Sequence, residues 1–215
     1  MSSLDRDVER AARAHQHLLQ SLDDLGDDQA RQASLLEGWS VGHVLTHVAR
    51  NADALRNVLE AAGRGEQGQM YPGGMEQRNA DIEAGAGRSA AALVADVRTA
   101  SWALEQCWAG LPGEAWAIIG MSPAGPRPAV DVPFLRCREV EVHRLDLGLG
   151  YTIEDWPADY VAEDLRRMTM LWASRRQMGM TVMPDAAMRA GDRLRLAWLL
   201  GRAEIAGVGP AGVYG

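Results

Sequence analysis

The chain has 215 residues, of which 47% are hydrophobic and 24% are charged, as in a soluble globular protein with one large domain or one domain and a small appendage. This composition excludes a largely disordered chain, a collagen-like fibre and a disulfide-stapled mini-protein. The formal net charge is −7, and all residues counted as lysine or arginine are arginine. That balance argues against a general nucleic-acid binder, because phosphate contacts need a basic face.

The two cysteines, Cys107 and Cys137, are too few for a disulfide framework. The first residues lack the apolar core of a secretion signal, and no run approaches the ~20 apolar residues of a membrane span. We therefore expect a cytoplasmic protein with reduced thiols that binds neither nucleic acid nor membrane.

Apolar residues recur at helical spacing in several segments of the chain. Ser40 and Ser89 stand where N-caps are expected, each before such a segment. The four helices predicted for the first part of the chain span residues 2–24, 41–63, 90–111 and 132–147.

Two long connections separate these helices. Residues 64–88 are polar and glycine-rich around Tyr71-Pro72-Gly73-Gly74, which predicts a surface loop with a turn of helix near Gln77–Ile82. A second irregular stretch precedes the helix at 132–147. Four helices joined in this way predict an antiparallel four-helix bundle, in which metal and ligand sites form from facing side chains.

The rest of the chain predicts a fifth helix at 157–177, a short strand at Gly179–Met183 and helix again at 192–206. The expected fold class is therefore mainly α. A bundle domain would occupy residues 1–150, and a reduced, mostly helical α/β appendage would occupy residues 151–215.

The histidines carry the chemical signal. His43 and His47 lie four residues apart on one predicted helix, and Glu139 and His143 have the same spacing on another, so each pair lies near one helix face. A Glu-x-x-x-His pair and a histidine from a neighbouring helix form the ligand set of an open site for zinc or another divalent metal. Charged pairs at this spacing are also common on helix surfaces, so spacing alone leaves both interpretations open.

Two longer segments resemble signatures of the mycothiol-dependent maleylpyruvate isomerase family, in the DinB-like superfamily. The first is GWSVGHVLTHVARNADAL at residues 38–55, and the second is REVEVHRLDLG at residues 138–148. Met70-Tyr71-Pro72, followed by QRNADI at 77–82, is a weaker match. The segments occur in the order of the family and at similar separations, and the resemblance covers about residues 5–150.

The resemblance implies a DinB-like bundle that carries a divalent metal, usually zinc. The family's ligands match His47, Glu139 and His143, whereas His43 lies one turn too early. The implied activity is isomerisation, in which the thiol of mycothiol adds to the cis double bond of maleylpyruvate. The resulting single bond rotates, and departure of the thiol gives fumarylpyruvate. The cofactors implied are therefore the metal and mycothiol as thiol cosubstrate, with a small unsaturated acid as substrate.

Three further residues are candidates for catalysis or substrate binding. Arg202, which follows Gly201, resembles an arginine of the family's C-terminal domain that is thought to reach the active site, and Arg78 lies in the weaker matching block. Either arginine would hold a carboxylate with two hydrogen bonds, and the alternative is a solvated surface residue. Asn51, four residues after His47, would orient a ligand or bind substrate unless it is a helix-surface amide.

Residues 155–215 are short for the appendage of the family isomerases, which leaves the substrate open. A mycothiol S-transferase in detoxification or biosynthesis, in which the thiol stays on the product, is one alternative. A non-enzymatic, metal-stabilised bundle is another, although an open ligand set favours an enzyme. A product assay separates the first two, because only an isomerase regenerates the free thiol.

Overall fold

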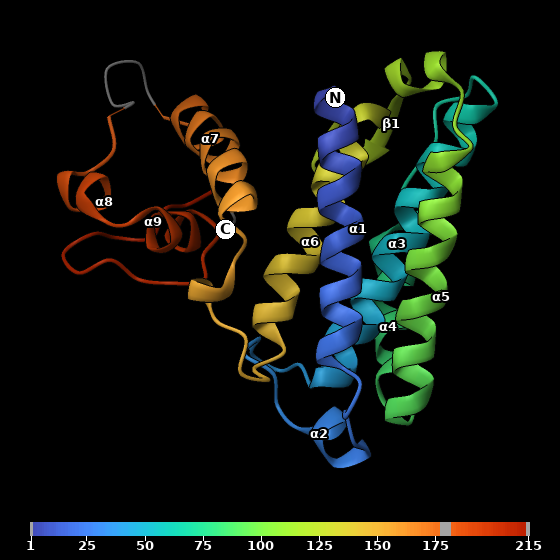
Figure 1. Cartoon of the computed structure of the whole chain (residues 1–215), viewed down its shortest axis with the longest axis horizontal. Coiled ribbons are helices and arrows are strands. Elements are labelled where there is room, and N and C mark those ends of the chain that lie inside the picture. Colours follow the sequence, from blue (N-terminus) through green and yellow to red (C-terminus); the bar gives the residue numbers. More distant parts are fainter. Residues whose placement is uncertain (1, 177–181, 214–215) are drawn as a thin grey trace. The chain divides into compact units, whose positions relative to one another are not determined.

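The computed structural model describes residues 2–176 and 182–213, and these are mainly helical (Figure 1). They divide into two units, Met1–Leu149 and Gly150–Gly215. In the described part of the chain, the strands form a single antiparallel hairpin. None of the helices described there is long and apolar enough to cross a membrane. The mainly α fold class expected from the sequence is confirmed.

The first unit is built around four long helices. Each helix contacts two others, so that α1 and α3 lie diagonally across the bundle from each other and both touch α5 and α6. In Figure 1, α1 and α6 run in one direction, and α3 and α5 run in the opposite one. The four are α1 (Ser3–Ser21), α3 (Val41–Gly63), α5 (Ala90–Ala109) and α6 (Val132–Asp146).

Two of these helices begin at the serines that the sequence indicates. The Ser40 hydroxyl accepts a hydrogen bond from the His43 backbone N–H, and Ser89 does the same for Ala92, each at 3.3 Å. Each bond satisfies a backbone donor that the first helical turn leaves without an internal partner. Both predicted caps are confirmed, and they fix where α3 and α5 start.

The connection at residues 64–88 is more ordered than expected, because it contains a helix, α4 (Gly74–Ala86). Only Ile82 and Ala86 of α4 are buried, so the sequence carries little apolar periodicity there. Two glycines let α4 approach α3 closely. A Cβ on Gly42 would clash with the Ala86 carbonyl, and one on Gly85 would clash with Thr46.

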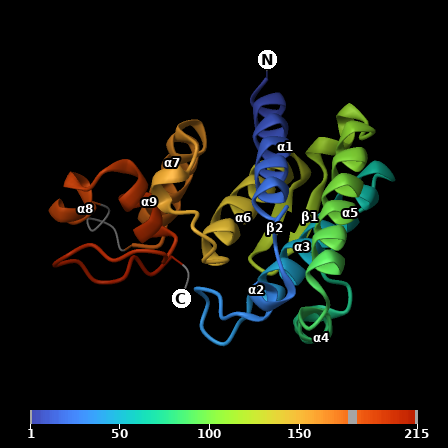
Figure 2. The ribbon, with the colours of Figure 1, turned by 60° about the horizontal axis from the view of Figure 1, so that its bottom comes forward.

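A hairpin also occurs where the sequence predicts only irregular structure. β1 (Ile119–Ser122) pairs with β2 (Gly125–Pro128), and β1 contacts α3 (Figure 2). Met121 of β1 also pairs with the loop before α4: its N–H donates to the Gly68 carbonyl at 2.8 Å, and its carbonyl accepts from Met70 at 2.9 Å. These bonds hold the loop against the bundle immediately before Tyr71.

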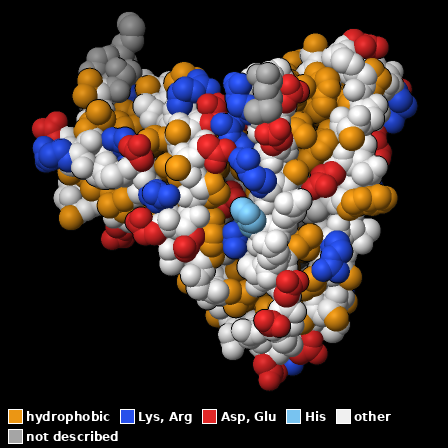
Figure 3. All heavy atoms as spheres, viewed as in Figure 1, with side chains coloured by type: hydrophobic (Ala, Val, Ile, Leu, Met, Phe, Trp, Pro, Cys, Tyr) orange, Lys and Arg blue, Asp and Glu red, His pale blue; other side chains and the backbone are white. Residues whose placement is uncertain are grey.

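The remaining elements of the first unit are short. Acidic side chains gather at the end of the unit where α2 lies, and side chains of both signs are interspersed elsewhere on the face in Figure 3. The short elements are α2 (Asp27–Arg31) and the 3₁₀ turns Gly113–Ala117 and Ala129–Asp131.

The second unit has its own aromatic core. Trp156, Tyr160, Trp172 and Trp198 are all buried, and the Trp156 and Tyr160 rings meet edge to face. The last helix ends at Leu199, earlier than residue 206. Most of the predicted strand at 179–183 lies outside the described residues, and Val182 and Met183 are not in a strand. The elements are the 3₁₀ turn Ile153–Asp155, α7 (Ala158–Ser174), α8 (Asp185–Arg189) and α9 (Asp192–Leu199).

Candidate metal centre

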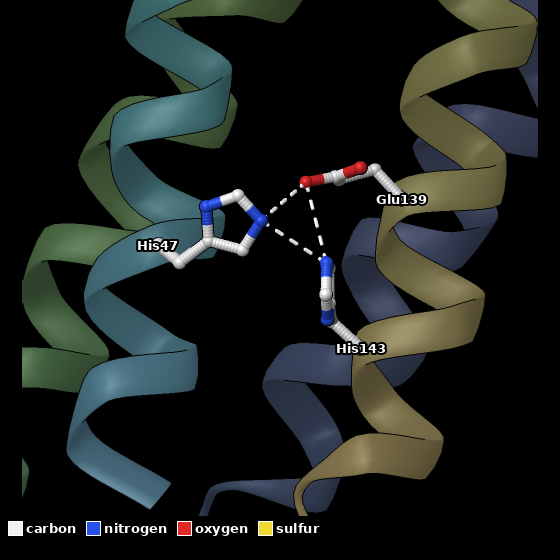
Figure 4. A group of neighbouring side chains, drawn as sticks. All are labelled: His47, Glu139 and His143. Carbon is white, nitrogen blue, oxygen red and sulfur yellow. Dashed lines mark hydrogen bonds and ion pairs between the residues drawn. The ribbon is translucent and has the colours of Figure 1, made fainter. Parts of the chain in front are cut away.

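The two helices α3 and α6 bring three side chains to one point inside the bundle. His47 lies in the second turn of α3, and Glu139 and His143 lie one turn apart on α6, which contacts α3. His47 and His143 are buried, and Glu139 is partly buried. Figure 4 shows the two imidazoles and the carboxylate pointing toward one another.

The three donor atoms lie within hydrogen-bonding distance of one another. His47 Nε2 is 2.7 Å from Glu139 Oε1 and 3.0 Å from His143 Nε2, and His143 Nε2 is 3.4 Å from the same oxygen. Ligands on a tetrahedral zinc ion are roughly 3.4 Å apart. Two ring nitrogens at 3.0 Å cannot both carry protons comfortably, whereas their lone pairs can share a cation. The arrangement therefore fits a divalent metal.

Asp146 supports this site from behind His143. Its Oδ2 lies 2.9 Å from His143 Nδ1, and the Asp146 side chain is buried. A carboxylate on Nδ1 holds the proton there and leaves Nε2 free as a ligand, as in carboxylate–histidine–metal groupings. The sequence analysis did not identify Asp146, although its spacing of three residues from His143 on one helix was a usable signal.

The three residues of the site shift one another's pKa values. Burial raises the pKa of Glu139, but His143 and His47 lower it to well below its ordinary value. Burial lowers the pKa of His143, but Glu139 and Asp146 raise it to about 9. The pKa of His47 is lowered, mainly by burial. The carboxylate of Glu139 is therefore held in its ionised form between the two imidazoles.

His43 is not part of this group. Its Nδ1 accepts a hydrogen bond from the Ser40 backbone N–H at 3.1 Å, and its Nε2 lies 3.2 Å from Glu83. Both ring nitrogens are therefore engaged at the start of α3, where His43 completes the cap. Of the two histidines left open by spacing, His47 is the one that faces α6.

Arg78 reaches the site from α4. Its Nη2 donates to His47 Nδ1 at 2.8 Å, and its guanidinium lies over the Trp39 ring at 5.7 Å from the centroid. A metal on His47 Nε2 would require a proton on Nδ1, and two N–H groups cannot face each other at that distance. If His47 Nε2 held a metal, the Arg78 donor would have to turn away from Nδ1, and the guanidinium would then face the site.

The other two sequence candidates lie in different places. Asn51 is buried one turn after His47, so it is not the helix-surface amide of the alternative interpretation. Arg202 belongs to the second unit, where its Nη1 donates to the Leu200 carbonyl at 3.1 Å and Gly201 has a positive φ of 71°. Its role at the site remains a prediction.

Two more residues near the site were given no role from sequence. Tyr71 immediately follows the loop that β1 holds, and it lines a cavity of about 240 Å³ together with Arg78. Arg136 is completely buried three residues before Glu139. An arginine directly after the apolar run at 132–135 of a bundle helix was the signal for the second of these.

Comparisons with known proteins give a family match and two similar solved structures. The model of the mycothiol maleylpyruvate isomerase N-terminal domain matches residues 11–148, which include His47, Glu139 and His143. A crystal structure of the mycothiol-dependent maleylpyruvate isomerase is similar, with a TM-score of 0.83 and 26% identity over 94% of this chain and 90% of that chain. A crystal structure of a histidine-to-alanine mutant of that isomerase gives the same values. Comparison with curated proteins gives no match.

The coverage also bears on the second unit. Since 94% of this chain is aligned, the structural similarity extends beyond the bundle, and 90% of the solved isomerase chain has a counterpart here.

Proposed function

Because the chain belongs to the mycothiol maleylpyruvate isomerase family, we propose that it is a metal-dependent isomerase that uses mycothiol to convert a cis unsaturated acid of the maleylpyruvate type into its trans isomer. The observation that carries the proposal is the convergence of His47, Glu139 and His143 inside a bundle of that family. The neighbouring arginine, Arg78, supplies a cation for an acid substrate.

The residues that would hold the metal are His47, Glu139 and His143, with Asp146 orienting one of the imidazoles. Two nitrogen donors and one oxygen donor suit zinc, which is our first choice. A bound metal of this kind supplies a Lewis acid and keeps a nearby thiol deprotonated at neutral pH. The chain's own side chains then have to bind and orient the substrate.

The isomerisation consumes no thiol, because the thiol that adds in the first step is released in the last. The thiolate sulfur forms a bond to one carbon of the double bond, and the π electrons move onto the oxygen of the conjugated carbonyl. The former double bond is then single and rotates. Return of the electrons re-forms the double bond in the trans geometry and expels the thiolate, so one thiol serves many turnovers.

Arg78 would hold the substrate carboxylate during this sequence. Its guanidinium lies over the Trp39 ring and contacts His47, and once free of Nδ1 it can make two parallel hydrogen bonds to a carboxylate. Arg202 is proposed as a second cation, from the resemblance of Gly201-Arg202 to the family. Asn51, which is buried one turn after His47, is proposed to orient a ligand or to bind substrate.

The proposal is tested with purified protein of known metal content, mycothiol and maleylpyruvate. The expected result is conversion to fumarylpyruvate at constant free thiol. Stoichiometric loss of thiol, with a conjugate as product, would identify an S-transferase instead. No thiol-dependent conversion by metal-loaded protein would contradict both enzymatic functions. His143→Ala is the matched negative control, because it removes one ligand on α6.

A further inference from the structure

Trp39, in the loop before α3, contacts both a proposed metal ligand and the arginine proposed to hold the substrate. The Trp39 and His47 rings meet edge to face, with their centroids 5.6 Å apart and their planes at 70°. The Arg78 guanidinium lies over the Trp39 ring, 5.7 Å from its centroid. Because Arg78 also donates to His47, each of these three side chains contacts the other two.

Backbone hydrogen bonds in the loop fix the position of Trp39. The Trp39 N–H donates to the Leu36 carbonyl at 3.0 Å, and the Trp39 carbonyl accepts from the N–H and the hydroxyl of Ser34, each at 2.8 Å. The Leu35 N–H donates to the Asp146 carbonyl at 2.8 Å. The loop that carries the indole is therefore joined to the end of α6 as well as to the start of α3, the two helices that bear the proposed ligands.

His43 supports the indole from the first turn of α3. The two rings stack, with their centroids 6.1 Å apart and their planes at 29°. His43 is itself held by Ser40 and Glu83. The indole therefore lies against side chains that limit its rotation, and it offers Arg78 a fixed surface.

A metal on His47 would affect two contacts of Arg78 differently. The hydrogen bond from Nη2 to His47 Nδ1, at 2.8 Å, would be lost, because Nδ1 would then carry a proton. The contact with the indole would not be lost in this way, since it depends on the π electrons of the ring and uses no N–H group. Arg78 Nη1 donates to the exposed Asn79 at 2.9 Å. The indole is thus a support that the guanidinium can keep while N–H groups released from His47 bind a carboxylate.

We propose that Trp39 is a positioning residue whose ring holds the Arg78 guanidinium beside the metal site, where it receives a carboxylate of the substrate. This inference rests on the proposed function, because it assigns the residue that keeps the carboxylate-binding group in place. Tryptophan gives the strongest cation–π contacts of the aromatic residues. A guanidinium that is already held loses less conformational freedom when the acid binds. Trp39 therefore contributes to the affinity for the acid and not to the rate of the chemical step.

Binding of an unreactive acid tests this role without turnover. Succinylpyruvate has the carboxylates of maleylpyruvate but lacks the double bond that the thiolate attacks, and calorimetry with metal-loaded protein gives its Kd. Trp39→Leu keeps an apolar side chain without a ring and should raise this Kd about fivefold. Trp39→Phe restores a weaker ring face, so its Kd should be only about twofold above wild type. Trp102→Leu, which changes a tryptophan of α5 that is 61% exposed, is the matched control and should keep the wild-type Kd.

A double variant separates positioning from a purely structural role. If Trp39 acts through Arg78, adding Trp39→Leu to Arg78→Met should raise the Kd for succinylpyruvate no further. Losses that multiply in the double variant would show an effect independent of Arg78 and would contradict the proposal. Trp39→Leu should also keep its metal affinity within about threefold of wild type in competition with a chelator. A much larger fall would assign the ring to His47 instead of Arg78 and would overturn the proposal.

Steady-state kinetics with mycothiol and maleylpyruvate add a second readout. Trp39→Leu should raise the KM for the acid about fivefold and keep kcat within about twofold of wild type, because it removes binding common to the ground state and the transition state. A lower kcat at unchanged KM would contradict this role. An unchanged Kd for succinylpyruvate in Trp39→Leu, or no binding by the wild type, would overturn the proposal. A wild-type protein that binds the acid but shows no thiol-dependent turnover would contradict the proposed function alone.

Discussion

Asp146 lies 2.9 Å from Nδ1 of His143 and so fixes which nitrogen of that ring faces the interior of the site. The Nε2 atom is thereby presented to Glu139 and His47. This places a second carboxylate behind the three proposed ligands and makes Asp146 the first residue to test.

Asp146→Asn should lower metal affinity about 10- to 100-fold, as loss of such an outer partner does. The amide can still accept from Nδ1–H, but it no longer supplies the negative charge that makes the imidazole a better ligand. Competition with a chromophoric chelator measures the affinity. Glu83→Gln, which changes the carboxylate beside His43, is the control and should leave the affinity unchanged. Equal affinities for wild type and Asp146→Asn would contradict this role.

His143→Ala should lose nearly all bound metal, because two ligands remain and the pair on α6 is broken. His43→Ala should keep a full complement, since His43 makes its contacts with Ser40 and Glu83. Elemental analysis of the two purified variants measures the metal content of each. Full occupancy in His143→Ala would remove that residue from the site.

Arg78→Met and Arg202→Met should each lower kcat/KM on an anionic acid by about 30- to 1000-fold, if each loses a carboxylate contact worth about 2–4 kcal/mol. Arg78→Met should also bind metal at least as tightly as wild type, because its donor no longer competes for His47 Nδ1. Steady-state kinetics and a metal titration measure the two effects. Wild-type kcat/KM in both variants on every acid tried would contradict an anionic substrate.

The stability of the fold should fall in mild acid because of His15. Burial lowers the pKa of His15 to about 4 from an ordinary value of 6.5. Between these values the unfolded chain binds a proton that the folded chain refuses, so stability decreases as the pH falls from 6.5 toward 4. The loss should reach about 3 kcal/mol.

Urea unfolding of wild type and His15→Gln at pH 7 and pH 4.5 measures this loss. Glutamine can still accept from Arg136 but does not titrate, so the free energy of unfolding of His15→Gln should decrease less over that interval. An equal loss of unfolding free energy in the two proteins between pH 7 and pH 4.5 would show that His15 is not the group responsible.

Neither cysteine should supply the nucleophilic thiol. Cys137 is buried, and burial raises the pKa of Cys107, so both sulfurs are poorly suited to act as thiolates. Cys107→Ser and Cys137→Ser should keep thiol-dependent turnover within about threefold of wild type, as measured with added mycothiol. Loss of turnover in a folded Cys137→Ser variant would mean that the chain provides its own thiol.

Much of the site could be predicted from sequence because its signals are local. Glu139 and His143 are placed together by the helical repeat alone, and the serine caps mark where α3 and α5 begin. The resemblance then selects His47 over His43. Spacing could not make that selection, since both histidines lie on one helix, and the packing of α6 then shows that His47 is the one beside Glu139 and His143.

The sequence by itself therefore determined the bundle helices and the residues proposed as metal ligands, because helix periodicity and short motifs depend on neighbours a few residues away. Only the tertiary structure decided what surrounds those ligands. Arg78 reaches His47 because glycines let α4 pack closely on α3, and α4 has too little apolar periodicity to be recognised alone. The buried hydrogen bonds from Arg136 to His15, Asn51 and Ser101 join the four bundle helices, and no local pattern encodes a hydrogen bond between residues 85 positions apart.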